Sequence, residues 1–156
     1  MLYFKTNSIT SINSEQIEKS IRKVSLKRFI HLDFKSTVNH YGENKLFLGY
    51  ESNGALYISR LRFLFEIILP KVIIRFDKLT GFAEYKIRLA LFSSTIFVFL
   101  LFDTLINIYY SIKSGNIENI FHIVNLLFVL YIILIAIEIR LTEKIINKTI
   151  KPDTIN

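Results

Sequence analysis

The sequence predicts an α+β membrane protein that begins with a small β-rich domain over residues 1–88, which contains one short amphipathic helix. A two-helix transmembrane hairpin over residues 89–139 follows, and then a C-terminal amphipathic helical extension. Three observations support this fold class. Residues 89–139 are two apolar segments separated by a short polar break, the preceding residues alternate as strands do, and all the excess positive charge precedes the first apolar segment.

The first part of the domain is predicted to be a short strand, a helix and a second strand. The strand runs through Leu2 and Phe4. Ile17, Ile21 and Val24 recur at helical spacing, and Asn13 with Gln16 resembles a capping box, so a helix is expected over Ser14–Lys27. From Arg28 the period changes to two, and Ile30, Leu32 and Phe34 alternate with polar residues. This alternation predicts a half-buried strand.

Two hairpins are predicted in the second part of the domain. Ser52-Asn-Gly is a strong turn signal between Lys45–Tyr50 and Ala55–Arg62. The run Phe63–Leu69, ended by Pro70, fits a strand, a short helix or a segment at the membrane surface, and a strand is favoured. Strands over Lys71–Asp77 and Phe82–Leu89 then flank the turn that ends at Gly81. The last strand leads almost without a linker into the first membrane span.

The two apolar segments have the length of membrane spans. Leu89–Tyr110 holds 22 residues with one charge, Asp103, and Ile120–Ile137 holds 18 residues with no full charge. A helix of 18 residues is about 27 Å long, close to the roughly 30 Å of a bilayer core. The spans are therefore expected at about residues 89–110 and 118–139.

Charge predicts the orientation of the hairpin. Residues 1–88 carry 15 Lys and Arg against 8 Asp and Glu, and residues 89–156 carry 5 of each. The positive-inside rule places both termini in the cytoplasm of a bacterial plasma (inner) membrane and the connecting loop outside. Residues 140–156, a cytoplasmic juxtamembrane helix and tail, pack back on the domain or lie in the headgroups. The side chains expected to face lipid headgroups are Arg75, Lys86, Arg88, Arg140 and Lys144. Glu138 and Arg140, at the inner membrane boundary, are expected to be solvated or snorkelling charges.

Four polar side chains are predicted to form a polar seam between the spans. Asp103 and Asn107 are four residues apart on one helix, and His122 and Asn125 are three apart on the other. In a hairpin that turns near Gly115, the two pairs lie at similar depths. The seam is interpreted first as a hydrogen-bonded contact between helices or with a partner, and second as a proton or ion relay.

A resemblance to a group of proteins adds to this description. From Leu56 to Phe102 a strand is followed by Glu66-Ile-Ile-Leu69 and Pro70, a turn, and a basic strand that feeds directly into a membrane hairpin. This order resembles uncharacterised small two-span bacterial membrane proteins with a β-rich, pleckstrin-homology-like domain. The resemblance implies a cytoplasmic β domain and no known activity.

Composition limits the chemistry. The chain has no cysteine, its three histidines are dispersed, and it lacks a glycine-rich phosphate loop. No catalytic residue, metal or cofactor is therefore predicted, and a nucleic-acid partner is not expected. The favoured function is non-enzymatic protein–protein interaction in the membrane, as an accessory subunit or an immunity protein against a membrane-active toxin, with lipids and a protein partner or homo-oligomer. The alternatives are an oligomeric transporter or ion-conducting component that uses Asp103, and an enzyme acting on lipid.

Overall fold

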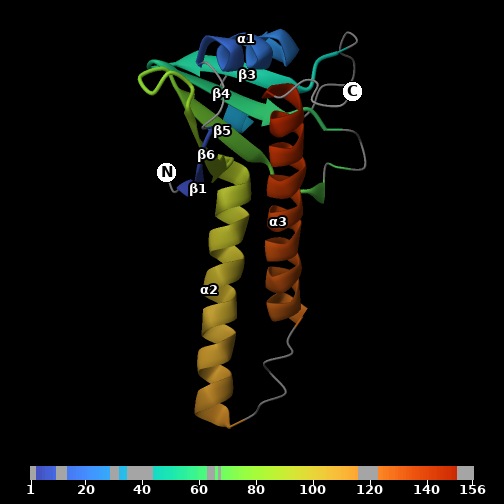
Figure 1. Cartoon of the computed structure of the whole chain (residues 1–156). Coiled ribbons are helices and arrows are strands. Elements are labelled where there is room, and N and C mark those ends of the chain that lie inside the picture. The colour runs from blue at the N-terminus through green and yellow to red at the C-terminus, as the bar shows by residue number, and fades with distance from the viewer. Residues whose placement is uncertain are drawn as a thin grey trace.

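The computed structural model describes residues 3–9, 14–28, 32–34, 44–62, 66, 68–115 and 123–150. In this part of the chain a six-stranded sheet precedes two long apolar helices, so the α+β class is confirmed (Figure 1). The elements are β1 (Tyr3–Ser8), α1 (Ser14–Val24), β2 (Ser25–Arg28), the 3₁₀ helix η1 (Leu32–Phe34), β3 (Phe47–Ser52), β4 (Ala55–Arg60), β5 (Val72–Asp77), β6 (Glu84–Leu89), α2 (Leu91–Ser114) and α3 (Ile123–Ile150).

The sheet has the strand order β1-β6-β5-β4-β3-β2. All neighbouring strands are antiparallel except β2 and β3, which are parallel. A parallel pair needs a crossover between its strands, and η1 lies within that crossover. The order leaves β1 and β2 at the two edges, so among the described residues this is an open sheet.

Both predicted hairpins are confirmed. β3 and β4 pair from Phe47↔Arg60 to Ser52↔Ala55, and the turn residues Asn53 and Gly54 have φ values of 49° and 69°. Asn and Gly tolerate this left-handed conformation better than other residues do, which explains the strong turn signal. β5 and β6 form the second hairpin.

Two strand predictions were wrong. The chain leaves α1 directly into β2 at Ser25, and Leu32 lies in η1 instead of in a strand. Leu32 is buried and Asp33 binds Arg88, so one inward and one polar position gave a strand-like alternation without a strand. In the run Phe63–Leu69, Glu66 and Ile68 have 3₁₀ geometry. The chain turns there, because the N–H of Leu69 donates to the carbonyl of Glu66 at 3.1 Å.

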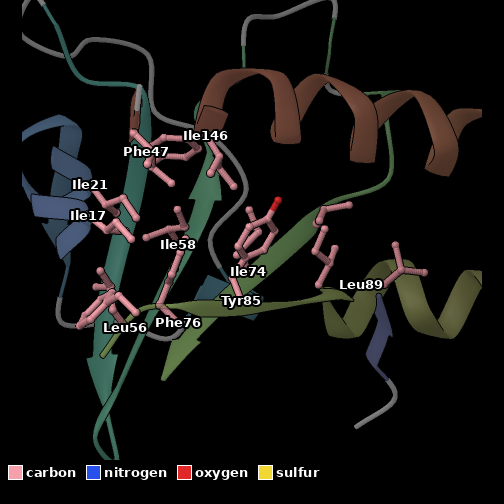
Figure 2. Packing of buried hydrophobic residues seen from close by; sticks show 14 residues of the cluster. Ile17, Ile21, Phe47, Leu56, Ile58, Ile74, Phe76, Tyr85, Leu89 and Ile146 are labelled. Carbon is pink, nitrogen blue, oxygen red and sulfur yellow. The ribbon is translucent and has the colours of Figure 1, made fainter. Parts of the chain in front are cut away.

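The main core lies on one face of the sheet, under α1 and the C-terminal half of α3. Figure 2 shows Ile17 and Ile21 of α1 and Ile146 of α3 approaching Phe47 and Ile58 of the sheet. In the C-terminal half of α3 the buried positions recur every four residues and form one ridge along the helix. They are Glu138, Thr142, Ile146 and Ile150. Of the two alternatives for the C-terminal extension, the structure therefore shows packing on the domain.

The hairpin continues directly from the sheet. β6 ends at Leu89 and α2 begins at Leu91, so one residue separates strand and helix, as predicted. α2 ends at Ser114, four residues beyond the expected span end, and Gly115 caps the helix with φ 69°. α3 is one unbroken helix through residues 139 and 140, where the sequence suggested a boundary. Both helices are long and apolar enough to cross a membrane.

Candidate functional site

The junction between the sheet and the hairpin contains a buried group of charges. Glu138 of α3 is 1% exposed, and its carboxylate accepts hydrogen bonds from Arg60 of β4 at 2.7 and 3.3 Å. The other end of the same guanidinium binds both carboxylate oxygens of Glu66 at 2.8 and 2.9 Å. Arg62 lies 3.6 Å from Glu138 and donates to the carbonyl of Leu69 at 2.6 Å. We call Arg60, Arg62, Glu66 and Glu138 the Glu138 network.

The two arginines of this network have different electrostatic environments. Burial disfavours the charged form of Arg60, but the hydrogen bonds to Glu138 and Glu66 outweigh this cost and raise its pKa. Burial lowers the pKa of Arg62, and attraction to Glu138 offsets only part of that effect. The Nη2 atom of Arg62 is buried and has no hydrogen-bond partner among the described residues. Arg60 therefore has a second carboxylate, Glu66, in direct contact, whereas Glu138 is the one carboxylate within 4 Å of Arg62 among the described residues.

A second group of charges fixes the start of α2. Arg88 of β6 donates to both oxygens of Asp33 at 2.9 and 2.8 Å, and the N–H of Leu91 donates to Asp33 at 2.8 Å. The carboxylate thus neutralises a buried guanidinium and caps the N-terminus of α2. Lys71 lies nearby and donates to the carbonyl of Leu32. Its burial, with repulsion from Arg62, lowers its pKa from 10.5 to about 8.

Hydrogen bonds from the backbone and hydroxyl groups complete the junction. Ser93 of α2 accepts a hydrogen bond from the N–H of Lys71 at 2.8 Å. Tyr131 of α3 donates to the carbonyl of Ser93 at 2.9 Å. The sheet, α2 and α3 are therefore connected by polar contacts at one level, where the apolar parts of the helices begin. This arrangement fixes the angle and the rotation of the hairpin relative to the sheet.

Two expectations about charges at this level were wrong. Glu138 was expected to be solvated or to snorkel, and Arg88 was expected to face headgroups, but Arg88 is only 3% exposed. The physical reason is the same for both residues, because each has an oppositely charged partner from a distant segment. The sequence did contain a signal for the burial of Glu138, because a lone carboxylate within a long apolar helix usually has a buried partner. Nothing in the sequence identified Arg60 or Asp33 as those partners.

The other four residues expected to face headgroups lie in different places. Arg75 and Lys86 are directly paired across β5 and β6, on the sheet face opposite the main core. Arg75 binds Asp77 at 3.2 Å and lies over the ring of Tyr57, and the hydrogen bond to Tyr3 raises its pKa. Lys86 is exposed. Arg140 and Lys144 are exposed on α3, beyond the apolar stretch.

The structure places the seam residues at different depths. Ser93 contacts Tyr131, and the rings of Phe97 and Phe128 are 5.7 Å apart. This register puts Asn125 level with residues 99 and 100 of α2, about four residues or roughly 6 Å nearer the sheet than Asp103. Asn107 donates to the backbone carbonyl of Asp103 at 2.9 Å. Asn125 is buried, and His122 lies outside the described residues.

In the described part of the chain, no group of three His, Asp or Glu side chains has the geometry of a metal site. A surface cavity of about 200 Å³ lies beside Arg22, Gly49 and Leu56, on the α1 side of the sheet. Arg22 in its wall is bound to Glu18 at 2.7 Å, and it also pairs with Glu51. The positive charge of Arg22 at this cavity is therefore already neutralised by ion pairs within the domain.

Comparison with known protein families, with curated proteins and with solved structures finds no match for this chain. The resemblance to two-span membrane proteins stays a prediction.

Proposed function

We propose that this chain is a non-enzymatic integral membrane protein that acts by protein–protein interaction in the bacterial plasma membrane. The observation that carries the proposal is the exposure of the hairpin. In the most apolar part of each helix, only 11% of the residues are buried. An apolar surface of this extent is unfavourable in water and is the ordinary surface of a helix in lipid.

The polar groups of the chain support the same arrangement. Most exposed side chains of α2 and α3 along the hairpin are apolar or aromatic, whereas Arg140 and Lys144 are exposed where α3 reaches the sheet. Basic residues at this end favour a cytoplasmic sheet domain. The polar junction then lies at the membrane surface and holds the domain against it. An accessory subunit or an immunity protein against a membrane-active toxin needs only such a rigidly presented binding surface.

Membrane insertion and orientation are tested with introduced cysteines, because the chain has none of its own. Ser114→Cys lies at the far end of α2, and Lys19→Cys lies on α1 in the sheet domain. The protein should stay in the membrane fraction after alkaline extraction. A membrane-impermeant maleimide should label Ser114→Cys on intact cells and Lys19→Cys only after permeabilisation. Recovery of the protein in the soluble fraction would refute the proposal, and the reverse labelling pattern would refute its orientation.

A second candidate function, ion or proton conduction by an oligomer, is favoured by one observation. Asp103 is a partly exposed carboxylate half-way along α2. Flux across liposomes that contain the purified protein tests this candidate. Conduction through Asp103 predicts a flux that Asp103→Asn abolishes, and an absence of flux in the wild type removes the candidate.

A further inference from the structure

Asp103 lies near the middle of α2, most of whose exposed side chains are apolar. It follows Leu91, the first residue of α2, by 12 residues, and α2 contains 24 residues. At 1.5 Å per residue, its Cα is about 18 Å from the start of the helix. In the membrane arrangement proposed above, the carboxylate is therefore deep in the hydrocarbon core.

The carboxylate lies on an outer flank of α2. Thr104, the next residue, is buried and lies at the position that faces α3, so Asp103 is rotated by about 100° from that contact. Its helical neighbours Phe99, Ile106 and Tyr110 are all exposed. Asp103 itself is partly exposed. The hairpin therefore does not enclose this side chain, and a second helix can reach it from the lipid.

Nothing in the described part of the chain neutralises this carboxylate. No ion pair or hydrogen bond to its side-chain oxygens is found among the described residues. The amide of Asn107, one turn away, donates to the backbone carbonyl of Asp103 instead. A carboxylate at this depth is costly, and natural proteins offset that cost by a partner group.

The chain itself has no lysine or arginine at this depth. Between Leu91 and Ile137 the only one is Lys113, ten residues or about 15 Å further along α2. A second copy of the chain packed flank to flank would bring another carboxylate against Asp103. A lysine or arginine opposite Asp103 therefore comes from a different protein, and His122, the other basic side chain in this part of the sequence, lies outside the described residues.

We infer that the Asp103 flank of α2 binds a transmembrane helix of another protein that carries a lysine or arginine near mid-membrane. This inference rests on the proposed function and names the chemistry of its partner. The cation lies about 12 residues from the cytoplasmic end of the partner's span, opposite Asp103. Apolar side chains one turn to either side of it pack against Phe99 and Ile106.

The test uses the full chain in liposomes with synthetic transmembrane helices as probes. One probe is a Leu/Ala helix with a single lysine 12 residues from its cytoplasmic end, and the matched probe has leucine there. A third probe has its lysine shifted by four residues, or about 6 Å. Energy transfer between labels on chain and probe measures association. The first probe should bind at least tenfold more tightly than the other two.

Variants of the chain identify the contact. Asp103→Asn should abolish the tenfold preference, and Thr95→Val, a matched change at an exposed hydroxyl of α2, should keep it. Circular dichroism and alkaline extraction check that each variant is folded and inserted. Equal binding of all three probes to an inserted chain overturns the inference and leaves the proposed function standing. A chain that does not insert overturns the proposed function itself.

Self-association is measured in the same liposomes with two differently labelled copies of the chain. The inference requires that Asp103→Asn leaves this signal unchanged. A signal that Asp103→Asn or His122→Leu abolishes would make a second copy the occupant of the flank, and would overturn the inference.

Discussion

Replacing Glu138 by glutamine should destabilise the protein far more than the same change at Glu143, which lies farther along α3. Glu138→Gln keeps the shape of the side chain and removes its charge. Arg60 retains its contact with Glu66, but Arg62 loses the carboxylate at 3.6 Å while its side chain is only 5% exposed. Removal of one partner from a buried ion pair costs about 3–5 kcal/mol, because the remaining charge is buried without compensation.

The control differs in exposure. Glu143 pairs with Lys5 at 2.7 Å, but these side chains are 19% and 47% exposed, and solvent screens the pair. Glutamine at 143 also keeps an acceptor for the amide of Asn7, which donates to Glu143 at 2.7 Å. The expected cost of Glu143→Gln is therefore about 1 kcal/mol or less.

Thermal unfolding followed by circular dichroism in detergent micelles measures the difference. For a chain of this size, 3 kcal/mol corresponds to a decrease in Tm of about 6–12 °C, and 1 kcal/mol to about 2–4 °C. The double variant Arg62→Met/Glu138→Met removes the guanidinium of Arg62 together with the carboxylate of Glu138. The ion pair of Arg60 with Glu66 remains. It should recover most of the lost stability. Equal Tm values for the two glutamine variants would refute the argument that Glu138 stabilises the junction electrostatically.

Three further predictions use the same unfolding assay. Burial lowers the pKa of Lys71 from 10.5 to about 8, so between these pH values the chain takes up a proton when it unfolds. The free energy of unfolding should therefore rise with pH from about 8 to 10.5, by at most about 3 kcal/mol. Lys71→Met should remove this rise, and a Lys71→Met variant with the same pH profile of stability as the wild type would contradict the prediction. Asp33→Ala should cost about 3 kcal/mol or more, since it leaves a buried guanidinium and the first N–H of α2 without their acceptor, whereas Asp77→Ala, at a partly exposed pair, should cost about 1. Gly81→Ala should destabilise the protein more than Gly54→Ala, for which we expect a cost of about 1 kcal/mol. Both glycines have positive φ, but only at Gly81 does a new Cβ come within 3.2 Å of Ser14, the first residue of α1. Equal costs would contradict the importance of that contact.

Local signals in the sequence were sufficient for the elements with strong turn or helix chemistry. Asn53-Gly54 defined the hairpin of β3 and β4, and the spacing of Ile17 and Ile21 defined the buried face of α1. The long apolar runs defined α2 and α3, although each helix ends beyond its predicted span. These features depend on residues close together in the chain, so sequence periodicity detects them.

The remaining features depend on contacts between distant residues. Asp33 pairs with Arg88, 55 positions away in the sequence, and Arg60 pairs with Glu138, 78 positions away. The residues around these side chains form no local pattern that distinguishes a buried ion pair from a solvated surface charge. The parallel pairing of β2 with β3 is equally remote from local sequence, because it depends on the path of the crossover that carries η1.

The buried carboxylate of Glu138 fixes the rotation of the helices of the hairpin. An apolar helix in lipid gains little from one rotation over another, because lipid chains are similar around its circumference. Glu138 removes this freedom, since its carboxylate must point at Arg60 and the ridge that continues to Ile150 must point at the sheet. α3 in turn fixes α2 through the contact of Tyr131 with Ser93, and with it the direction of the Asp103 flank. The partner helix that we propose would consequently meet the sheet domain in one orientation, which a flexible tether would not achieve.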